Sequence, residues 1–146
     1  MHDDRPMREW IIKLEERTTT FAERAKALCD LLPNTPGIRP TAYQLSEASG
    51  SVASNHSACR RSRSDRELAA KLQVVNEEAD ECVKWLELLS RAPTGHAGEV
   101  AELLAEAKEL RAIFGKSVGT TNRRIDAAEE LRKRERERRR KRRGGR

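Results

Sequence analysis

The stretch that decides the fold is residues 45–89, LSEASGSVASNHSACRRSRSDRELAAKLQVVNEEADECVKWLELL. Its second half carries apolar side chains three and four residues apart, the spacing of one face of a helix. They are Leu68, Leu72, Val75, Ala79, Cys82, Leu86 and Leu89. Ser64 and Glu67 form a capping-box pattern, which predicts that this helix begins there. Residues 48–54 have almost no side-chain bulk, so we expect a neighbouring backbone to come close to them.

Three further segments repeat the helical spacing on either side of this helix. Apolar or small residues follow it over residues 7–32, 41–59 and 100–118. Proline and glycine interrupt the chain at residues 33–40 and 93–95, where we expect connecting loops. Four amphipathic helices with short connections predict an all-α fold, an up-down antiparallel four-helix bundle.

The composition suits a thin helical core. Of the 146 residues, 36% are hydrophobic and only 3% are aromatic, a balance that favours packed helices over a sheet. A chain with so few apolar residues often completes its core against a partner or a second copy. We expect a four-helix bundle over residues 7–121 and an Arg-rich C-terminal extension over residues 122–146.

The positive charge is concentrated in that extension. Residues 132–146 hold 11 Lys and Arg but only two Asp and Glu, a net charge of +9, whereas the other 131 residues sum to −3. This asymmetry indicates an anionic partner such as RNA or DNA. Glu and a base recur four residues apart, a spacing that stabilises an exposed helix. The pairs are Glu129–Lys133, Glu130–Arg134, Glu135–Arg139 and Glu137–Lys141. The extension is therefore either a helical rod or disordered.

Several classes of protein are disfavoured. Cys29, Cys59 and Cys82 are odd in number and lack CxxC spacing, which argues against a disulfide framework or a zinc ribbon. Reduced thiols fit a cytoplasmic protein. The N-terminal residues contain no apolar segment of the kind found in signal peptides. No apolar run approaches the roughly 20 residues that a membrane span needs, so we expect no membrane partner.

An ordered set of residues is similar to a known family. Asn55-His56, Arg60-Arg61-Ser62-Arg63-Ser64, Glu67, Lys71-Leu72, Glu77-Glu78-Ala79-Asp80-Glu81 and Trp85-Leu86-Glu87 carry most of the similarity, with Leu31-Leu32-Pro33, Gln44-Leu45 and Ala112-Ile113-Phe114 on either side. In this order and spacing, the chain resembles the bacterial four-helix bundle proteins, also called 23S rRNA intervening-sequence proteins. The resemblance covers about residues 8–120.

The resemblance implies an up-down four-helix fold and a ring-like homo-oligomer, commonly a pentamer. It also implies kinship with the accessory proteins of diversity-generating retroelements, which bind nucleic acid and a reverse transcriptase. No catalytic residue carries over from the family, and most of its members have no established biochemical role. The extension after residue 122 lies outside the family's pattern.

Two groups of bases are candidate nucleic-acid-binding residues. The first group lies where one predicted helix ends and the next begins, and a helix N-terminus favours an anion. The second lies in the extension, where each phosphate contact would release counterions. The candidates are Arg60, Arg61, Arg63, Arg66, Arg132, Lys133, Arg134, Arg138, Arg139, Arg140, Lys141, Arg142 and Arg143.

Both groups also have a structural explanation. The first four arginines could instead pair with Glu77, Glu78, Asp80 and Glu81, within or between subunits. The extension could be a solvated segment that only aids solubility. Because it has no aromatic residues among its bases, base stacking with a single strand is not expected.

The remaining polar residues favour structural roles. Asn55 falls on the apolar seam, where one buried amide often fixes register and oligomeric state, and Trp85 beside the seam can pack against another helix or subunit. His56, Cys59 and Cys82 lack a fourth zinc ligand, so we expect packed thiols and no metal.

Catalytic patterns are weak. The acidic run at residues 77–81 lacks the Glu-x-x-His pairs of di-iron bundles. Arg91 and His96 match the R-x4-H spacing of helical HEPN ribonucleases, but Pro93 and Gly95 break the helix that the motif requires. We expect a non-enzymatic oligomeric bundle without cofactors that associates with nucleic acid, as an accessory to an enzyme such as a reverse transcriptase. The alternatives are an oligomeric scaffold with no nucleic-acid role and, more distantly, a HEPN-like ribonuclease.

Overall fold

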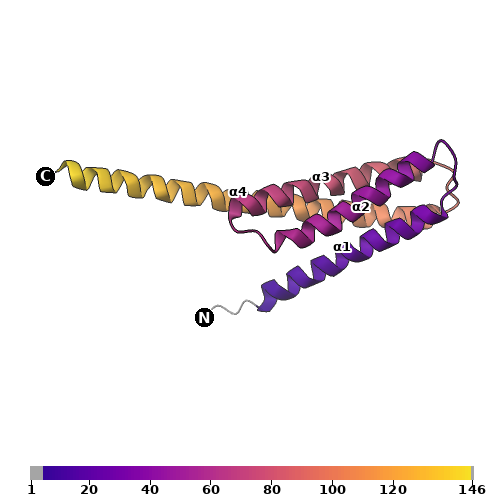
Figure 1. Cartoon of the computed structure of the whole chain (residues 1–146), viewed down its shortest axis with the longest axis horizontal. Coiled ribbons are helices and arrows are strands. Elements are labelled where there is room, and N and C mark those ends of the chain that lie inside the picture. Colours follow the sequence, from indigo (N-terminus) through magenta and orange to yellow (C-terminus); the bar gives the residue numbers. More distant parts are fainter. Residues whose placement is uncertain (1–4, 146) are drawn as a thin grey trace.

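The computed structural model describes the backbone of residues 5–145 and the side chains of residues 9–145. Its elements are α1 (Arg5–Leu31), α2 (Arg39–Cys59), α3 (Asp65–Ser90) and α4 (Ala97–Gly144). No strand occurs in the described range. The helices run up and down side by side, with the α1–α2 and α3–α4 loops at one end and the α2–α3 loop at the other (Figure 1). The predicted all-α four-helix fold is confirmed.

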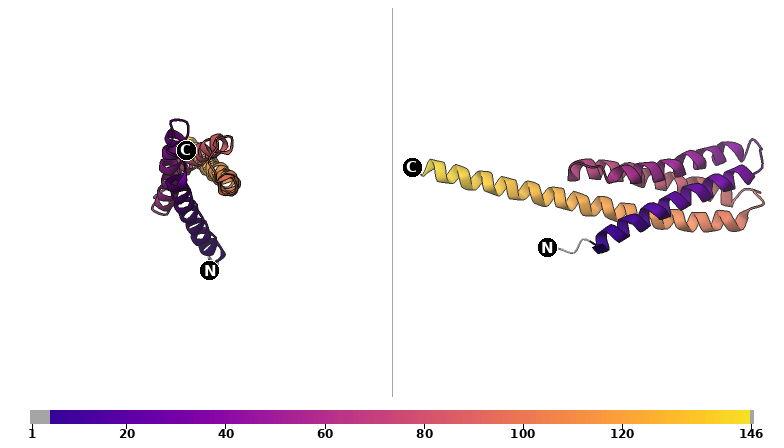
Figure 2. Two further views of the ribbon diagram at one scale, coloured as in Figure 1. Left: turned by 90° about the vertical axis from the view of Figure 1, so that its right-hand side faces the viewer. Right: turned by 60° about the horizontal axis from the view of Figure 1, so that its bottom comes forward.

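The helices pack mainly on their neighbours in the sequence. The α2–α3 and α3–α4 contacts are extensive, whereas α1 and α4 touch only sparsely. Figure 2 shows the reason, because the first turns of α1 lean away from the other three helices. The bundle is therefore tightest around α3 and opens at the start of α1. Within residues 5–145, no helix combines the length and the apolar character that a membrane-spanning segment needs.

The predicted seams of α1, α3 and α4 form the core. Their largest fully buried side chains are Phe21, Leu28, Val75, Leu86, Leu89, Val100, Leu103, Leu110 and Phe114. Burying a side chain of this size contributes about 1.5–3 kcal/mol relative to leaving it in water. The predicted seam of α1 starts at Met7, whose side chain lies outside the described residues.

The seam of α2 differs from the prediction in its second half. Leu45 and Val52 are fully buried as expected, but the next buried residue is His56 rather than Asn55. A straight α-helix has 3.6 residues per turn and drifts about 20° per heptad away from a 3.5-residue repeat. Three turns after Leu45 the core-facing position is therefore eleven residues on, at His56.

Asn55 consequently fixes no register within the chain. It is half-buried, and its Nδ2 donates to the backbone oxygen of Ser51 in the same helix at 2.9 Å.

Residues 48–54 were expected to let a neighbouring backbone come close, but at Gly50 a side chain comes close instead. The nearest group to a Cβ added at Gly50 would be the Lys26 ammonium of α1, at 3.3 Å. Gly50 thus leaves room for the Lys26 side chain, which donates to the backbone oxygen of Ser46.

The start of α3 has the predicted cap. The Ser64 Oγ accepts from the backbone N–H of Glu67 at 3.1 Å. The Glu67 carboxylate in turn accepts from the backbone N–H of Arg63 at 3.2 Å, one residue before the cap. Donors that would otherwise have no partner at the helix end are satisfied, and this fixes where the α2–α3 loop ends.

We expect Ser64→Ala to lower the free energy of unfolding by about 1 kcal/mol, because the N-cap acceptor is lost. Urea denaturation followed by far-UV circular dichroism measures the change. Ser54→Ala is the matched control, because the Ser54 hydroxyl only donates to the backbone oxygen of Ser51 within α2. Equal midpoints for the two variants would contradict a stabilising cap.

Candidate nucleic-acid interface

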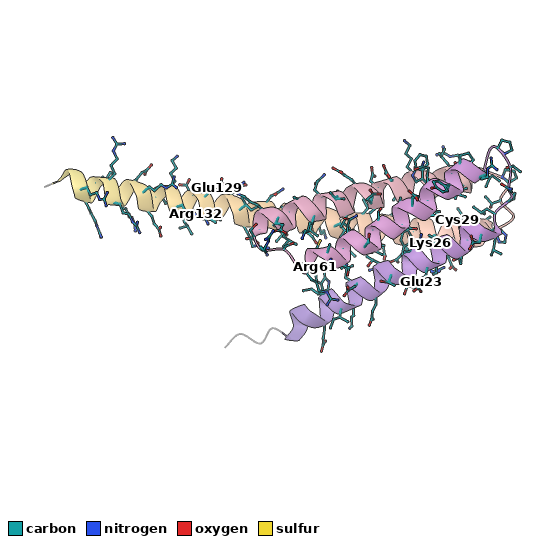
Figure 3. The ribbon with its side chains drawn as sticks, in the orientation of Figure 1. Glu23, Lys26, Cys29, Arg61, Glu129 and Arg132 are labelled. Carbon is teal, nitrogen blue, oxygen red and sulfur yellow. The ribbon has the colours of Figure 1, made fainter. Side chains whose placement is uncertain are left out.

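The α2–α3 loop lies at the end of the bundle from which α4 projects. Figure 3 places Arg61 at this end of the bundle, and Glu129 and Arg132 farther along α4, on the part that projects. The up-down order explains the position, because α2 ends and α4 leaves the bundle at the same end. Residues 60–66 and the extension, distant in the sequence, are therefore neighbours in space.

Two ion pairs join the start of α3 to this part of α4. Arg124 contacts Asp65 at 2.9 Å, and Arg66 contacts Glu129. All four side chains are substantially exposed, so the pairs contribute little to stability. They do, however, hold the end of the α2–α3 loop beside the base of the extension.

The loop arginines differ in what they contact. Arg60 pairs with Glu15 of α1, and Arg63 pairs with Glu67 at 3.4 Å while its side chain is 89% exposed. Arg61 is exposed, and no described carboxylate forms an ion pair with it. Arg61 and Arg63 are thus the most available for an anion from outside the chain.

The alternative pairing with the acidic run of α3 does not form among the described residues of a single chain. Asp80 instead pairs with Arg111 of α4 at 2.8 Å, and Glu77 accepts from Gln73 at 3.1 Å. Pairing of the loop arginines with this run across a subunit boundary stays a prediction.

The extension is the exposed second half of α4. This helix has 48 residues and continues unbroken from the bundle to Gly144. Thr121 is its last buried residue; from residue 122 to residue 145 the side chains are exposed, except for half-buried Ile125. The helical alternative for the extension is therefore the one observed. Of its four predicted ion pairs, the structure forms one, Arg134 with Glu130 at 3.0 Å.

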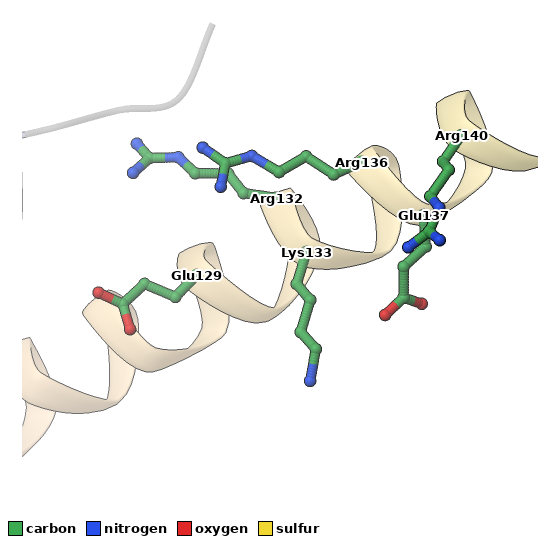
Figure 4. Close-up of a pocket in the computed structure, with 6 residues that line it drawn as sticks. All are labelled: Glu129, Arg132, Lys133, Arg136, Glu137 and Arg140. Carbon is green, nitrogen blue, oxygen red and sulfur yellow. The ribbon is translucent and has the colours of Figure 1, made fainter. Parts of the chain in front are cut away.

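The bases of the extension lie on every side of the helix. All nine predicted candidates from Arg132 to Arg143 are exposed. Arg132 and Arg136 point in one direction and Lys133 in another (Figure 4), so one turn presents cations on two sides. The hollow in Figure 4 is an open gap between exposed side chains, and it encloses no site.

Arg136 belongs to this surface although the sequence analysis omitted it. Together with Arg132, Arg139 and Arg143 it follows the spacing i, i+4, i+7 and i+11, which places the four residues on one face of a helix. The same spacing was visible in the sequence. It was missed because the region was treated as Glu-to-base pairs rather than as a face.

The three thiols are buried or half-buried. Burial raises the pKa of Cys29 to about 11 and also raises the pKa of Cys59 and Cys82. Burial therefore favours the neutral thiol at each of the three positions. Among the described residues, no group of three or more His, Cys, Asp and Glu side chains is placed to hold a metal ion.

Arg91 and His96 cap two different helices. Arg91 ends α3 and His96 precedes α4, with Thr94 and Gly95 between them in the loop. The backbone N–H of His96 donates to the Thr94 hydroxyl at 3.2 Å. This loop lies at the opposite end of the bundle from the arginines of the α2–α3 loop (Figure 1). The HEPN motif requires both residues on one helix, whereas here they flank two different helices.

The fold and this surface define a class: an up-down four-helix bundle whose last helix continues into a basic rod. A solved structure has a similar fold, that of a protein of unknown function from the S23 ribosomal protein family of Bacteroides thetaiotaomicron. The TM-score is 0.65 at 21% sequence identity, and the match covers 97% of that chain and 72% of this one. The fold implied by the family resemblance is thereby confirmed. No protein-family model and no curated protein matches the sequence.

The buried ring of His56 makes stability depend on pH. Burial lowers its pKa below the ordinary value of 6.5, so the folded state holds the neutral ring. Below about pH 6.5 the unfolded chain binds more protons than the folded chain. The free energy of unfolding therefore falls as the pH is lowered through 6.5 and levels off at the folded-state pKa.

We expect His56→Phe to remove this pH dependence and to raise the free energy of unfolding by about 1 kcal/mol at neutral pH. The phenyl ring leaves no buried polar nitrogen without a partner. Urea denaturation at several pH values measures both effects. His96→Asn is the control, and a pH dependence unchanged in His56→Phe would contradict the assignment.

Proposed function

We propose that the protein is a non-enzymatic, oligomeric four-helix bundle of the cytoplasm that binds nucleic acid through one continuous basic surface. The observation that carries the proposal is the position of the α2–α3 loop arginines beside the base of the helical extension. In this proposal the protein is an accessory to an enzyme that acts on RNA or DNA, such as a reverse transcriptase.

Electrostatics determines what the surface would recognise. The stretch from Arg132 to Arg143 spans about 17 Å at 1.5 Å per residue. Its guanidinium groups suit phosphate oxygens, which fix position without reading sequence. Because the extension has no aromatic residue, stacking on bases contributes nothing there. The expected binding is therefore independent of sequence and strongly dependent on salt.

Replacing Arg132, Arg136, Arg139 and Arg143 together with Gln tests the extension. We expect the slope of log affinity against log salt to become shallower by about 3, because four phosphate contacts are lost. Fluorescence anisotropy with a labelled RNA and a labelled DNA duplex, over a series of salt concentrations, measures the slope.

A second variant with the same change in charge is the control. It replaces Lys13, Arg39, Arg91 and Lys108 with Gln, four exposed bases outside the proposed surface. We expect this variant to keep most of the slope. Equal losses in the two variants would show that net charge alone matters and would contradict a defined surface.

Exposed apolar side chains on α3 support the proposed self-association. Val74 and Leu88 are large apolar side chains with 40% and 43% of their surface exposed. Trp85 lies on the same side of the helix, half-buried, and its Nε1 is buried without a hydrogen-bond partner. An exposed apolar stripe with an unsatisfied donor favours contact with another subunit. This is also the observation that favours the pure scaffold as the second candidate.

Charge reversal at the loop separates the two candidates. We expect Arg61→Glu with Arg63→Glu to weaken nucleic-acid binding and to reduce the salt slope by about 2, while the oligomeric mass stays the same. Anisotropy and sedimentation velocity measure the two properties. If the oligomer dissociates and binding per subunit is unchanged, the arginines serve subunit contacts and the scaffold is the better account.

A further inference from the structure

A cleft of about 590 Å³ opens where the first turns of α1 lean away from the bundle. All four helices contribute to its walls. Its apolar surface comes from Trp10 and Leu14 of α1, Leu68 and Leu72 of α3, and Ile113 and Phe114 of α4. Its volume falls within the range of about 300–1,000 Å³ that is usual for small-molecule sites, and so does its largely apolar lining.

The charged residues that line the cleft are all basic. Arg60, Lys116 and Arg124 line it, and no Asp or Glu does. Arg60 and Arg124 are each paired with a carboxylate, Glu15 and Asp65 respectively. Lys116 is exposed and forms no ion pair with any described residue. An occupant with a negative group would find a cation at Lys116.

The buried ring of His56 is a second feature of the cleft, separate from its charge. His56 lines the cleft with only 8% of its surface exposed, and its ring centroid lies 5.4 Å from that of Phe114. Its Nδ1 is buried and has no hydrogen-bond partner. Buried polar atoms without partners are rare in folded proteins and call for an explanation, such as a missing ligand. A polar group of an occupant can give this nitrogen a hydrogen-bond partner.

We propose that this cleft binds an amphipathic organic anion, a medium-chain carboxylic acid of the fatty-acid type. The apolar chain lies against Leu14, Leu72 and Ile113, and the carboxylate lies toward Lys116 and the ring of His56. The basic extension of a second copy is disfavoured as the occupant, because its cations would meet Lys116 and find no carboxylate in the lining. The proposal does not rest on the proposed nucleic-acid binding.

The chain offers a fluorescent reporter for this site. Trp10 lines the cleft and Trp85, the other of the two tryptophans, does not. In the full chain carrying Trp85→Phe, we expect decanoate below its micelle concentration to give a saturable blue shift of Trp10 emission. Isothermal titration calorimetry on the unmodified chain is expected to give one site per subunit. Decanol, which lacks the charge, should bind at least about threefold more weakly.

Two substitutions test the two halves of the site. Lys116→Gln should weaken decanoate binding about threefold or more and leave decanol binding unchanged, whereas Lys108→Gln, an exposed lysine of α4 outside the cleft, should change neither. Ser117→Leu should weaken binding of both ligands, because Ser117 lines the cleft and a leucine side chain narrows it. Its folding is checked by far-UV circular dichroism and by an undiminished urea midpoint.

Three results would overturn the proposal. The first is the absence of saturable heat and of any Trp10 shift with decanoate. The second is an equal effect of Lys116→Gln and Lys108→Gln. The third is decanoate binding that is unchanged in Ser117→Leu but is lost when Arg132, Arg136, Arg139 and Arg143 are replaced, which would place the anion on the extension. Nucleic-acid binding by the same samples is measured separately, so either proposal can fail without the other.

Discussion

The structure depends on a mismatch of helix lengths. α4 has 48 residues, whereas α1, α2 and α3 have 27, 21 and 26. Only the first half of α4 can therefore pack against the other helices of the chain, and the second half is exposed on all sides. The sequence changes at that point from an apolar stripe ending near Phe114 and Thr121 to almost continuous charge. A helix exposed on every side has nothing to bury, so charged side chains with high helix propensity suit it.

The same mismatch explains how the extension stays helical. Nucleating a helix is unfavourable, while adding a residue to an existing helix is close to neutral or favourable for good helix formers. The packed half of α4 is such a nucleus, and the extension only has to propagate from it. The Arg134–Glu130 pair adds a few tenths of a kcal/mol. Like charges along the rod oppose it, and a polyanion bound there would relieve that repulsion.

Much of the fold could be predicted from residue spacing alone, because a bundle is specified by which positions are apolar. The seams of α1, α3 and α4 and the Ser64 cap are examples. The seam of α2 was predicted wrongly at Asn55, whose place His56 takes, since short stretches do not distinguish a 3.5-residue from a 3.6-residue repeat. The partner of Glu129 was also missed. Lys133, four residues along the same helix, was the predicted partner. Arg66 comes within reach of Glu129 only once α3 and α4 lie side by side.

The interface and the cleft could not be derived from local patterns, because both arise where helices end at different levels. The up-down order brings the loop arginines to the exit of α4, and the lean of α1 leaves the apolar surface near His56 uncovered. Arg60 and Arg124 border both features. An anion in the cleft would lower the positive potential around the loop, but at physiological salt this effect decays over about 8 Å. Charges near Arg143, many helical turns away, would not respond. Occupancy of the cleft would therefore weaken phosphate contacts at the α2–α3 loop and leave those at the end of the rod unchanged.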